Sequence, residues 1–235
     1  MSDNSDKSGW VRFFDSDHAI YVNARHKAVH ALITCDGMLK YVRRSDRVLD
    51  YGSGEAAYAE RLVREAESLT LCDAAPNLRD QVMRRVSHER YILMLSPEEV
   101  AALPGASFEV IILHSVSQYL SAKQLDELLA LFRRLLVPDG KLVIGDVVQP
   151  GTPAWKDASA LLRFGWREGF FFAALGGLVK TALSDYSRLR KEAGLSRYSE
   201  REMTDKLQAA GYRAHRQGEN IGHLQTRMTF VAVPR

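Results

Sequence analysis

A glycine turn between a strand and a helix constrains this chain more than any other feature. Apolar residues through Leu49 lead into the pattern Asp50-x-Gly52-x-Gly54, and a helical stretch follows from Tyr58. Two glycines permit a tight turn and a close approach of the backbone to a ligand. A strand, a glycine turn and a helix in this order are typical of a parallel α/β sheet with a nucleoside ligand at the turn.

The carboxylate before the glycines narrows the class of ligand. Asp50 at the strand end would favour a cationic ligand and disfavour a pyrophosphate, because like charges repel. We therefore predict that Asp50, Gly52 and Gly54 contact a cationic nucleoside ligand. The alternative is a purely structural turn in which Asp50 caps backbone amides.

A second carboxylate ends the next predicted strand. Residues 69–73 form a short apolar run that ends at Asp73, which lies about 20 positions past the glycine turn, and an acidic residue at this spacing suits ribose hydroxyls. Asp73 and the adjacent Ala74 are therefore candidate ligand-binding residues. Asp73 can also cap the helix begun by Pro76, and the two roles are compatible.

Strand and helix patterns alternate along the chain, which predicts a mainly parallel sheet covered on both faces. Capping boxes that begin at Ser96, Ser121 and Ser199 mark the starts of three helices. We expect a polar tail and a helical lid over residues 1–44 and one domain over residues 45–235. Strands are expected near residues 46–51, 69–73, 90–95, 108–113 and 140–147.

Composition excludes several classes of protein. With 46% apolar and 26% charged residues, the chain has the composition of a soluble globular protein. Its 32 basic and 29 acidic residues are too balanced to indicate a nucleic-acid partner. The two cysteines have no C-x-x-C spacing, and the polar N-terminus lacks the apolar core of a signal peptide. A cytoplasmic protein is the expectation.

Residues 149–198 interrupt the alternating pattern and form a predicted helical insert. The apolar run from Gly169 to Lys180 within it is too short to span a bilayer. Three interpretations stay open: packing under the rest of the insert, lining a substrate pocket, or touching a membrane surface without stable insertion. In the second interpretation the aromatic lining would come from Trp166, Phe170, Phe171 and Phe172.

His114 ends the fourth predicted strand and is the most conspicuous titratable residue, with Tyr119 close by in sequence. Both are candidate catalytic residues, and His114 could act as a general base. Alternatively, its ring only packs at the strand end. His26 and His30 are four residues apart, but the glutamate of H-E-x-x-H is missing. No metal is predicted.

Several segments together resemble the class I S-adenosylmethionine-dependent methyltransferases. Asp50-x-Gly52-x-Gly54 resembles the first motif of that family, and Asp73 matches the acidic residue after its second strand. The segments at residues 107–114 and 135–144 are similar to its fourth strand and its helix-to-strand turn, with Asp139 in place of a glycine. The likeness covers roughly residues 45–147 and 199–233.

The resemblance implies a doubly wound, mainly parallel seven-stranded sheet with an antiparallel C-terminal strand. It implies S-adenosylmethionine as cofactor and methyl transfer to a small, apolar or amphipathic acceptor. Asp50 and the glycine turn would hold the methionine portion, and Asp73 would hold the ribose. Ser96 or Glu98 would take the place of the family's usual acidic residue at the adenine, and the His114 backbone would also touch the cofactor.

The N-terminal helix supplies two further candidates under this resemblance. Arg25 could pair with the carboxylate of the cofactor, because a guanidinium suits a planar carboxylate. Tyr21 could cover the cofactor as a lid. A solvated helix face is the alternative for both.

Two other functions stay open. One is a nicotinamide-dependent oxidoreductase that uses the same glycine turn, which Asp50 disfavours. The other is a non-catalytic S-adenosylmethionine-binding protein whose insert is a docking surface. The segment after the fourth strand, His114 to Ser117, lacks the "N/D-P-P-Y" motif, which disfavours nucleic-acid bases and protein glutamine as acceptors. The oligomeric state stays open.

Overall fold

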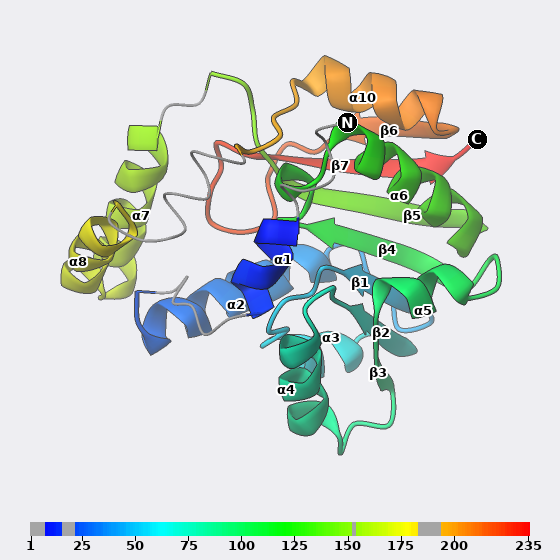
Figure 1. Cartoon of the computed structure of the whole chain (residues 1–235), viewed down its shortest axis with the longest axis horizontal. Coiled ribbons are helices and arrows are strands. Elements are labelled where there is room, and N and C mark those ends of the chain that lie inside the picture. The colour runs from blue at the N-terminus through cyan, green and yellow to red at the C-terminus, as the bar shows by residue number, and fades with distance from the viewer. Residues whose placement is uncertain (1–7, 16–21, 152–153, 183–193) are drawn as a thin grey trace.

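One seven-stranded sheet organises the molecule (Figure 1). The computed structural model describes residues 8–15, 22–151, 154–182 and 194–235. The strand order is β3-β2-β1-β4-β5-β7-β6, and helices cover both faces of the sheet. The predicted fold class is confirmed. The strands are β1 (Arg47–Tyr51), β2 (Ser68–Cys72), β3 (Ile92–Leu95), β4 (Phe108–His114), β5 (Leu136–Val147), β6 (Tyr212–Arg216) and β7 (Met228–Pro234).

The order in which strands are added to the sheet switches from one side of β1 to the other. Strands β1 to β5 pair in parallel, whereas β7 is antiparallel to both β5 and β6. From β1 the chain first builds β2 and β3 on one side and then returns to β4 on the other. Ligands of open α/β sheets bind at the carboxyl ends of the strands at such a switch point. The fold therefore predicts a site where β1 and β4 end.

The helices form two layers around the sheet. Helices α2, α3 and α4 pack on one face, and α5, α6 and α10 pack on the other. Their apolar stripes are buried, as expected of amphipathic helices that cover a sheet. The helices are α1 (Ser8–Asp15), α2 (Ala24–Leu39), α3 (Ala59–Val63), α4 (Pro76–Val86), α5 (Pro97–Ala102), α6 (Ala122–Leu135), α7 (Ala154–Glu168), α8 (Phe171–Ala182) and α10 (Glu200–Ala209).

The central strand β4 is covered by helices on both faces, and for this reason its sequence is an unbroken apolar run. Val110 and Ile112 pack with one helical layer, and Ile111 and Leu113 pack with the other. Successive side chains of a strand point to opposite faces, so a strand covered on both sides is apolar at every position. All four side chains are completely buried.

Two elements differ from the expectation. Residues 8–15, expected as part of a polar tail, form α1, whose Trp10 is only 3% exposed. The helix after the glycine turn, expected to follow from Tyr58, begins at Ala59 and already ends at Val63, so it is short. None of the helices in the described part of the chain is long and apolar enough to cross a membrane.

The three predicted capping boxes are confirmed, and the one at Ser121 can be tested. Its hydroxyl accepts a hydrogen bond from Gln124 N, and the Gln124 side chain accepts one from Ser121 N. We expect Ser121→Ala to lower the free energy of unfolding by about 1 kcal/mol, the usual loss on removing an N-cap. Urea unfolding would measure it. Ser45→Ala, at an exposed position, is the control and should change stability little.

Candidate active site

A large cavity of about 1480 Å³ lies along the carboxyl edge of the sheet. Its wall is formed by the ends of β1, β2 and β4 together with α1, α2 and the loop between β6 and β7. We call the part formed by Gly52, Ser53, Gly54, Asp73 and Ala74 the glycine-turn side. The part formed by His30, His114 and His223 is the histidine side.

The glycine turn is tied directly to the end of β2. Gly52 N and Ser53 N both donate to Cys72 O, at 2.7 and 3.0 Å. Gly52 has a φ of 78°, and a Cβ there would lie 2.3 Å from Val116 Cγ2. Because both the backbone conformation and the space exclude a side chain, glycine is required here. Ser53 Oγ is buried without a hydrogen-bond partner.

Asp73 connects the turn to the following strand-to-helix loop. Its carboxylate accepts hydrogen bonds from Gly54 N at 2.9 Å and from Ala75 N at 3.0 Å. Burial nonetheless raises the pKa of Asp73 above its usual value, although these backbone bonds oppose the rise. Asp73 thus organises the loop and lines the cavity at the same time. The residue at the N-cap of α4 is Ala75, so the expected capping of that helix by Asp73 is wrong.

Asp50 lies behind the cavity wall. It is buried, and its Oδ2 accepts a hydrogen bond of 2.6 Å from the hydroxyl of Tyr58. Tyr58 lines the cavity, and Asp50 does not. Burial raises the pKa of Asp50 to about 7, against the opposing effect of the Tyr58 hydrogen bond. The side chain that lines the cavity here is therefore Tyr58, which the sequence analysis did not single out, and not Asp50.

The imidazole ring of His114 lies beside two glycines, Gly145 and Gly222. A Cβ at Gly145 would lie 2.7 Å from His114 Nδ1, and one at Gly222 would lie 3.9 Å from its Cε1. The ring fits because neither neighbour has a side chain. Its Nδ1 is buried without a hydrogen-bond partner. Burial lowers the pKa of His114 to about 4, so the imidazole is neutral at neutral pH.

Two more histidines line the same side of the cavity. The ring centroids of His30 and His223 are 5.6 Å apart. Burial, assisted by the neighbouring histidines, lowers the pKa of His30 to about 4 and that of His223 to about 3. No local pattern in the sequence marks this group, because His30 lies on α2 and His223 on the loop between β6 and β7. Asp146 and Arg227 complete this part of the wall.

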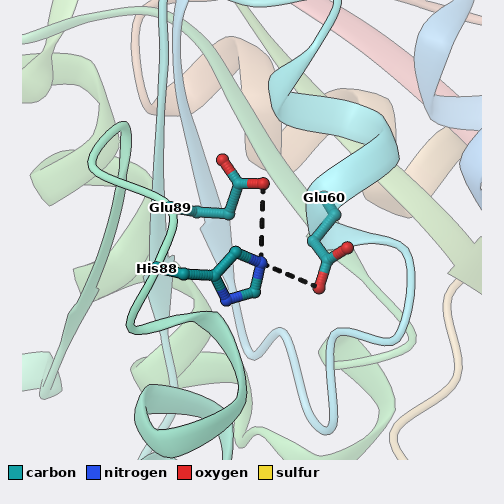
Figure 2. A group of neighbouring side chains, drawn as sticks. All are labelled: Glu60, His88 and Glu89. Carbon is teal, nitrogen blue, oxygen red and sulfur yellow. Dashed lines mark ion pairs between the residues drawn. The ribbon is translucent and has the colours of Figure 1, made fainter.

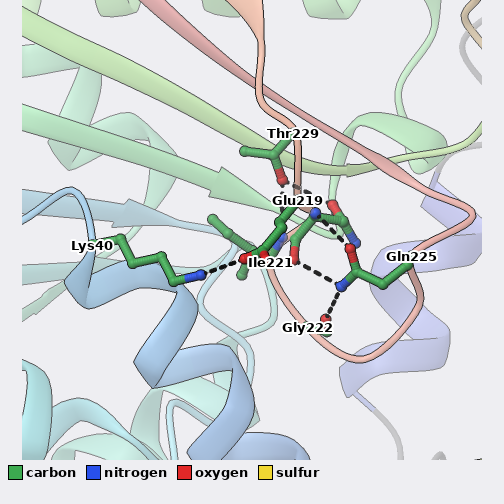
Figure 3. A network of polar contacts seen from close by, with 7 residues as sticks. Lys40, Glu219, Ile221, Gly222, Gln225 and Thr229 are labelled. Atoms are coloured by element: carbon green, nitrogen blue, oxygen red, sulfur yellow. Dashed lines mark hydrogen bonds and ion pairs between the residues drawn. The ribbon is translucent and has the colours of Figure 1, made fainter.

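A polar network holds the loop that carries His223 (Figure 3). Asn220 Oδ1 accepts hydrogen bonds from Asp146 N at 3.0 Å and from the Thr229 hydroxyl at 2.8 Å. Gln225 Nε2 donates to the carbonyl oxygens of Asn220 and Gly222. Because buried polar groups of a loop must be paired, this network fixes its backbone. The loop therefore presents His223 from a defined position.

Helix α1 borders the cavity beside Tyr119. The rings of Trp10 and Phe14 lie 4.6 and 5.3 Å from the Tyr119 ring. The Asp15 carboxylate accepts a 2.7 Å hydrogen bond from Asn77 N in the first turn of α4. Residues Trp10, Phe14, Asp15, Asn77 and Tyr119 all line the cavity. Tyr119 is thus packed within an aromatic group.

Several expected site residues lie elsewhere. Ser96 caps α5 through Glu99 and does not line the cavity, whereas Glu98 does. Arg25 donates from Nε to Glu168 O of the insert and is also outside the cavity wall. Tyr21 lies outside the described residues. The Arg25 contact depends on which elements meet, which local spacing does not encode.

The insert aromatics do not line the cavity, contrary to the pocket interpretation. Phe170 is buried, and with Phe164 and Ala174 it forms a small separate core against α2. Trp166 and Phe172 are exposed. Packing within the insert therefore accounts for only part of its apolar run.

One group of possible metal ligands occurs among the described residues (Figure 2). His88 Nε2 lies 3.9 Å from a Glu60 carboxylate oxygen and 3.7 Å from a Glu89 one. None of the three lines the cavity. The sequence missed this group because Glu60 lies on α3, whereas His88 and Glu89 follow the end of α4. Its partly exposed side chains form ordinary surface ion pairs when His88 is protonated, and such pairs contribute little to the stability of the fold.

The comparisons with known proteins agree with this geometry. Residues 49–144 match the family model of a methyltransferase domain. The N-methyltransferase NodS from Bradyrhizobium japonicum, solved with S-adenosylhomocysteine, has a TM-score of 0.55 and 15% identity, over 97% of this chain and 96% of that one. The DhpI–S-adenosylhomocysteine complex has a TM-score of 0.62 and 12% identity, over 97% and 96%.

A third solved structure has the same fold. Human N-acetylserotonin methyltransferase, in complex with S-adenosylmethionine, has a TM-score of 0.59 and 11% identity, over 97% of this chain and 56% of that one. At these identities the likeness is one of fold. A search of curated protein sequences gives no significant match.

The sheet order and the cavity beside the glycine turn define an α/β protein with a candidate ligand site at the switch point. With the match of residues 49–144 to a methyltransferase domain, they show that the chain has the fold of the methyltransferases compared above.

The raised pKa of Asp50 has a consequence for stability. A carboxyl whose pKa is higher in the folded state stabilises that state at low pH, and this contribution is lost as the pH rises from about 4 to about 7. Asp50→Asn lacks the titration but can still accept the Tyr58 hydrogen bond. We expect the stability of the variant relative to the native protein to rise over this range, by on the order of 3–4 kcal/mol.

Urea unfolding of both proteins at a series of pH values would measure this difference. The histidines titrate in both proteins, so their contributions cancel in the comparison. A difference that is independent of pH would show that Asp50 ionises normally in the folded state.

Proposed function

We propose that this protein transfers a methyl group from S-adenosylmethionine to a small amphipathic molecule bound at the histidine side. The observation that carries the proposal is one continuous cavity with two unlike parts: a glycine turn with Asp73, and a group of neutral histidines. A site of this kind can hold a cofactor and an acceptor together, which is the main requirement for group transfer.

The residues of the glycine-turn side fit the cofactor. Ser53 Oγ, buried and unpartnered, is free to bond a ligand. Each Asp73 oxygen accepts one backbone hydrogen bond and retains lone pairs for ribose hydroxyls. The missing side chain at Gly52 lets the backbone approach closely. We assign the ribose to Asp73 and the adenine end to Glu98 and Ala74, which also line the cavity.

Asp50 is assigned a positioning role through Tyr58. The Tyr58 hydroxyl donates to Asp50, so its ring is held at the cavity wall. An ionised Asp50 would also favour the positive charge of S-adenosylmethionine, because burial leaves its field poorly screened. When bound, that cofactor supplies an electrophilic methyl group on a cationic sulfur.

His114 is assigned to orient the acceptor. An imidazole whose pKa lies near 4 is a weak base at neutral pH. Its neutral ring can still donate or accept one hydrogen bond with the acceptor. An acceptor atom that is already nucleophilic needs only positioning and exclusion of water. Of the two roles considered for the His114 ring, this environment favours a hydrogen-bonding group over a strong general base.

The acceptor is proposed to be amphipathic because the cavity wall around the histidines contains both apolar and polar side chains. Apolar side chains at Val148, Leu195 and Leu224 line the cavity together with the histidines and Arg227. An apolar wall with a few polar groups is typical of small-molecule sites. This apolar lining comes from the end of β5, the end of the insert and the β6–β7 loop, and not from the insert phenylalanines.

The cofactor assignment can be tested by binding. We expect Asp73→Ala to weaken S-adenosylhomocysteine binding by about 1.5–3 kcal/mol, because a charged hydrogen-bond acceptor is lost. Isothermal titration calorimetry would measure it. Asp139→Ala, at an exposed position of β5 outside the cavity, is the matched control. Unchanged affinity in a folded Asp73→Ala protein would exclude the ribose role.

The acceptor assignment needs a measurement that separates the two sides of the cavity. We expect His114→Ala to keep its affinity for S-adenosylhomocysteine and to lower turnover about tenfold or more, the effect of one buried hydrogen bond. Turnover would be followed as transfer of a labelled methyl group to an acceptor found by screening amphipathic small molecules. His215→Ala, on the exposed part of β6, is the control. Full turnover by a folded His114→Ala protein would contradict the assignment.

A further inference from the structure

Helices α7 and α8 expose aromatic side chains on the outside of the molecule. They extend to one side of the sheet, away from its helical layers (Figure 1). Trp155, Trp166 and Phe172 are 66%, 77% and 86% exposed, whereas Trp10 is 3% exposed. Single exposed apolar residues are common, but large aromatic side chains gathered at one place indicate a contact surface.

The exposed side chains are connected. The ring of Phe171 lies 5.7 Å from the rings of both Trp166 and Phe172. Leu175, three residues after Phe172, lies on the same face of α8 and is 48% exposed. We call Trp166, Phe171, Phe172 and Leu175 the aromatic patch. It joins the two helices into one apolar surface.

The patch is not needed for packing the two helices onto the protein. Their inner side buries Phe164, Phe170 and Ala174, against apolar residues of α2 that include Val29 and Ile33. A helix with only one covered side would normally be polar on the other. The outer apolar surface therefore calls for an explanation beyond the fold.

Charge indicates the kind of partner. Arg163 and Arg167 are exposed on α7, the helix that carries Trp166. The Arg167 guanidinium lies 5.8 Å from the centroid of the Phe164 ring and also pairs with Glu168. Residues 149–198 carry eight Lys or Arg and four Asp or Glu, whereas the whole chain is nearly balanced at 32 and 29. Basic residues beside exposed Trp, Phe and Leu are the composition of segments that lie in a membrane interface.

We propose that the aromatic patch docks on the surface of a lipid bilayer that contains anionic lipids. Tryptophan prefers the headgroup region, phenylalanine and leucine gain by leaving water, and arginines are attracted to the negative surface. No described helix is able to cross the membrane, so the contact is a peripheral one. This inference does not depend on the acceptor proposed above.

Docking would take place next to the acceptor side of the cavity. Phe164, on the inner side of α7, stacks on His223 with ring centroids 4.3 Å apart and planes 11° from parallel. His223 lines the cavity. One layer of side chains thus separates the docking helices from the proposed acceptor site.

Vesicle binding of the full chain tests the proposal. We expect it to sediment with vesicles of phosphatidylcholine and phosphatidylglycerol in equal parts, and more weakly with phosphatidylcholine alone or at high salt. Tryptophan emission should shift to shorter wavelength on binding, because Trp155 and Trp166 are exposed in the free protein. An absence of binding to both kinds of vesicle would overturn the proposal.

Variants identify the surface responsible. The double substitution Trp166→Ser and Phe172→Ser should lower partitioning into anionic vesicles about tenfold, because two large apolar side chains no longer leave water. Met83→Ser on α4, where the native side chain is 52% exposed, is the matched control and should bind as the native protein does. Unchanged S-adenosylhomocysteine binding and thermal unfolding would verify that both variants are folded.

Two results would overturn the assignment of the patch to lipid. One is equal vesicle binding by the double variant and the native protein. The other is a native dimer in sedimentation velocity that the double variant loses, without any vesicle binding, since the patch would then join two copies of this chain. Arg163→Glu should weaken binding to anionic vesicles selectively, and an equal effect on both lipid compositions would also contradict the charge argument.

Discussion

The attachment of the glycine turn to the end of β2 is the constraint on which the rest of the site depends. Gly52 N and Ser53 N share the carbonyl oxygen of Cys72, and Gly54 N donates to the Asp73 carboxylate. These bonds hold the turn open toward the cavity and place Asp73 at its wall. Val116 closes the other side so tightly that no side chain fits at Gly52. The ends of β1, β2 and β4 are thereby fixed relative to one another before any ligand binds.

Desolvation gives the two sides of the cavity complementary properties. Burial raises the pKa of Asp50 and Asp73, and burial lowers the pKa of His30, His114 and His223. Both shifts disfavour the charged forms, as expected when charged groups are costly in a poorly hydrated environment. A cationic ligand at the carboxylates would favour their ionised form.

Short-range patterns in the sequence predicted most of the fold. The alternation of apolar strands with amphipathic helices predicted the sheet, and three capping boxes placed the starts of α5, α6 and α10. Asp73 and the glycine turn were also found, because a strand, a turn and the next strand lie close together in sequence. Each of these signals depends on residues a few positions apart.

The residues that sequence missed or misplaced depend on long-range contacts. His30 and His223 meet although they are far apart in the chain, and Arg25 reaches a carbonyl of the insert. Tyr58 matters because it reaches back to Asp50 across the turn. Helix α1 is short and follows a polar stretch, so its burial becomes visible only when Trp10 meets Tyr119. Pairings of this kind follow from how the elements assemble, which no local spacing records.

The histidine side shows how such long-range assembly can make a site sensitive to its surroundings. Two contacts hold His223. The Asn220 network fixes the loop that carries it, and the ring of Phe164 from the insert stacks on its imidazole. The first support belongs to the rigid sheet edge, because Thr229 lies on β7 and Asp146 on β5. The second belongs to helices whose own core is small. A contact made by the outer face of the insert would therefore act on the weaker support, and His223 is the cavity residue that such a contact would affect first.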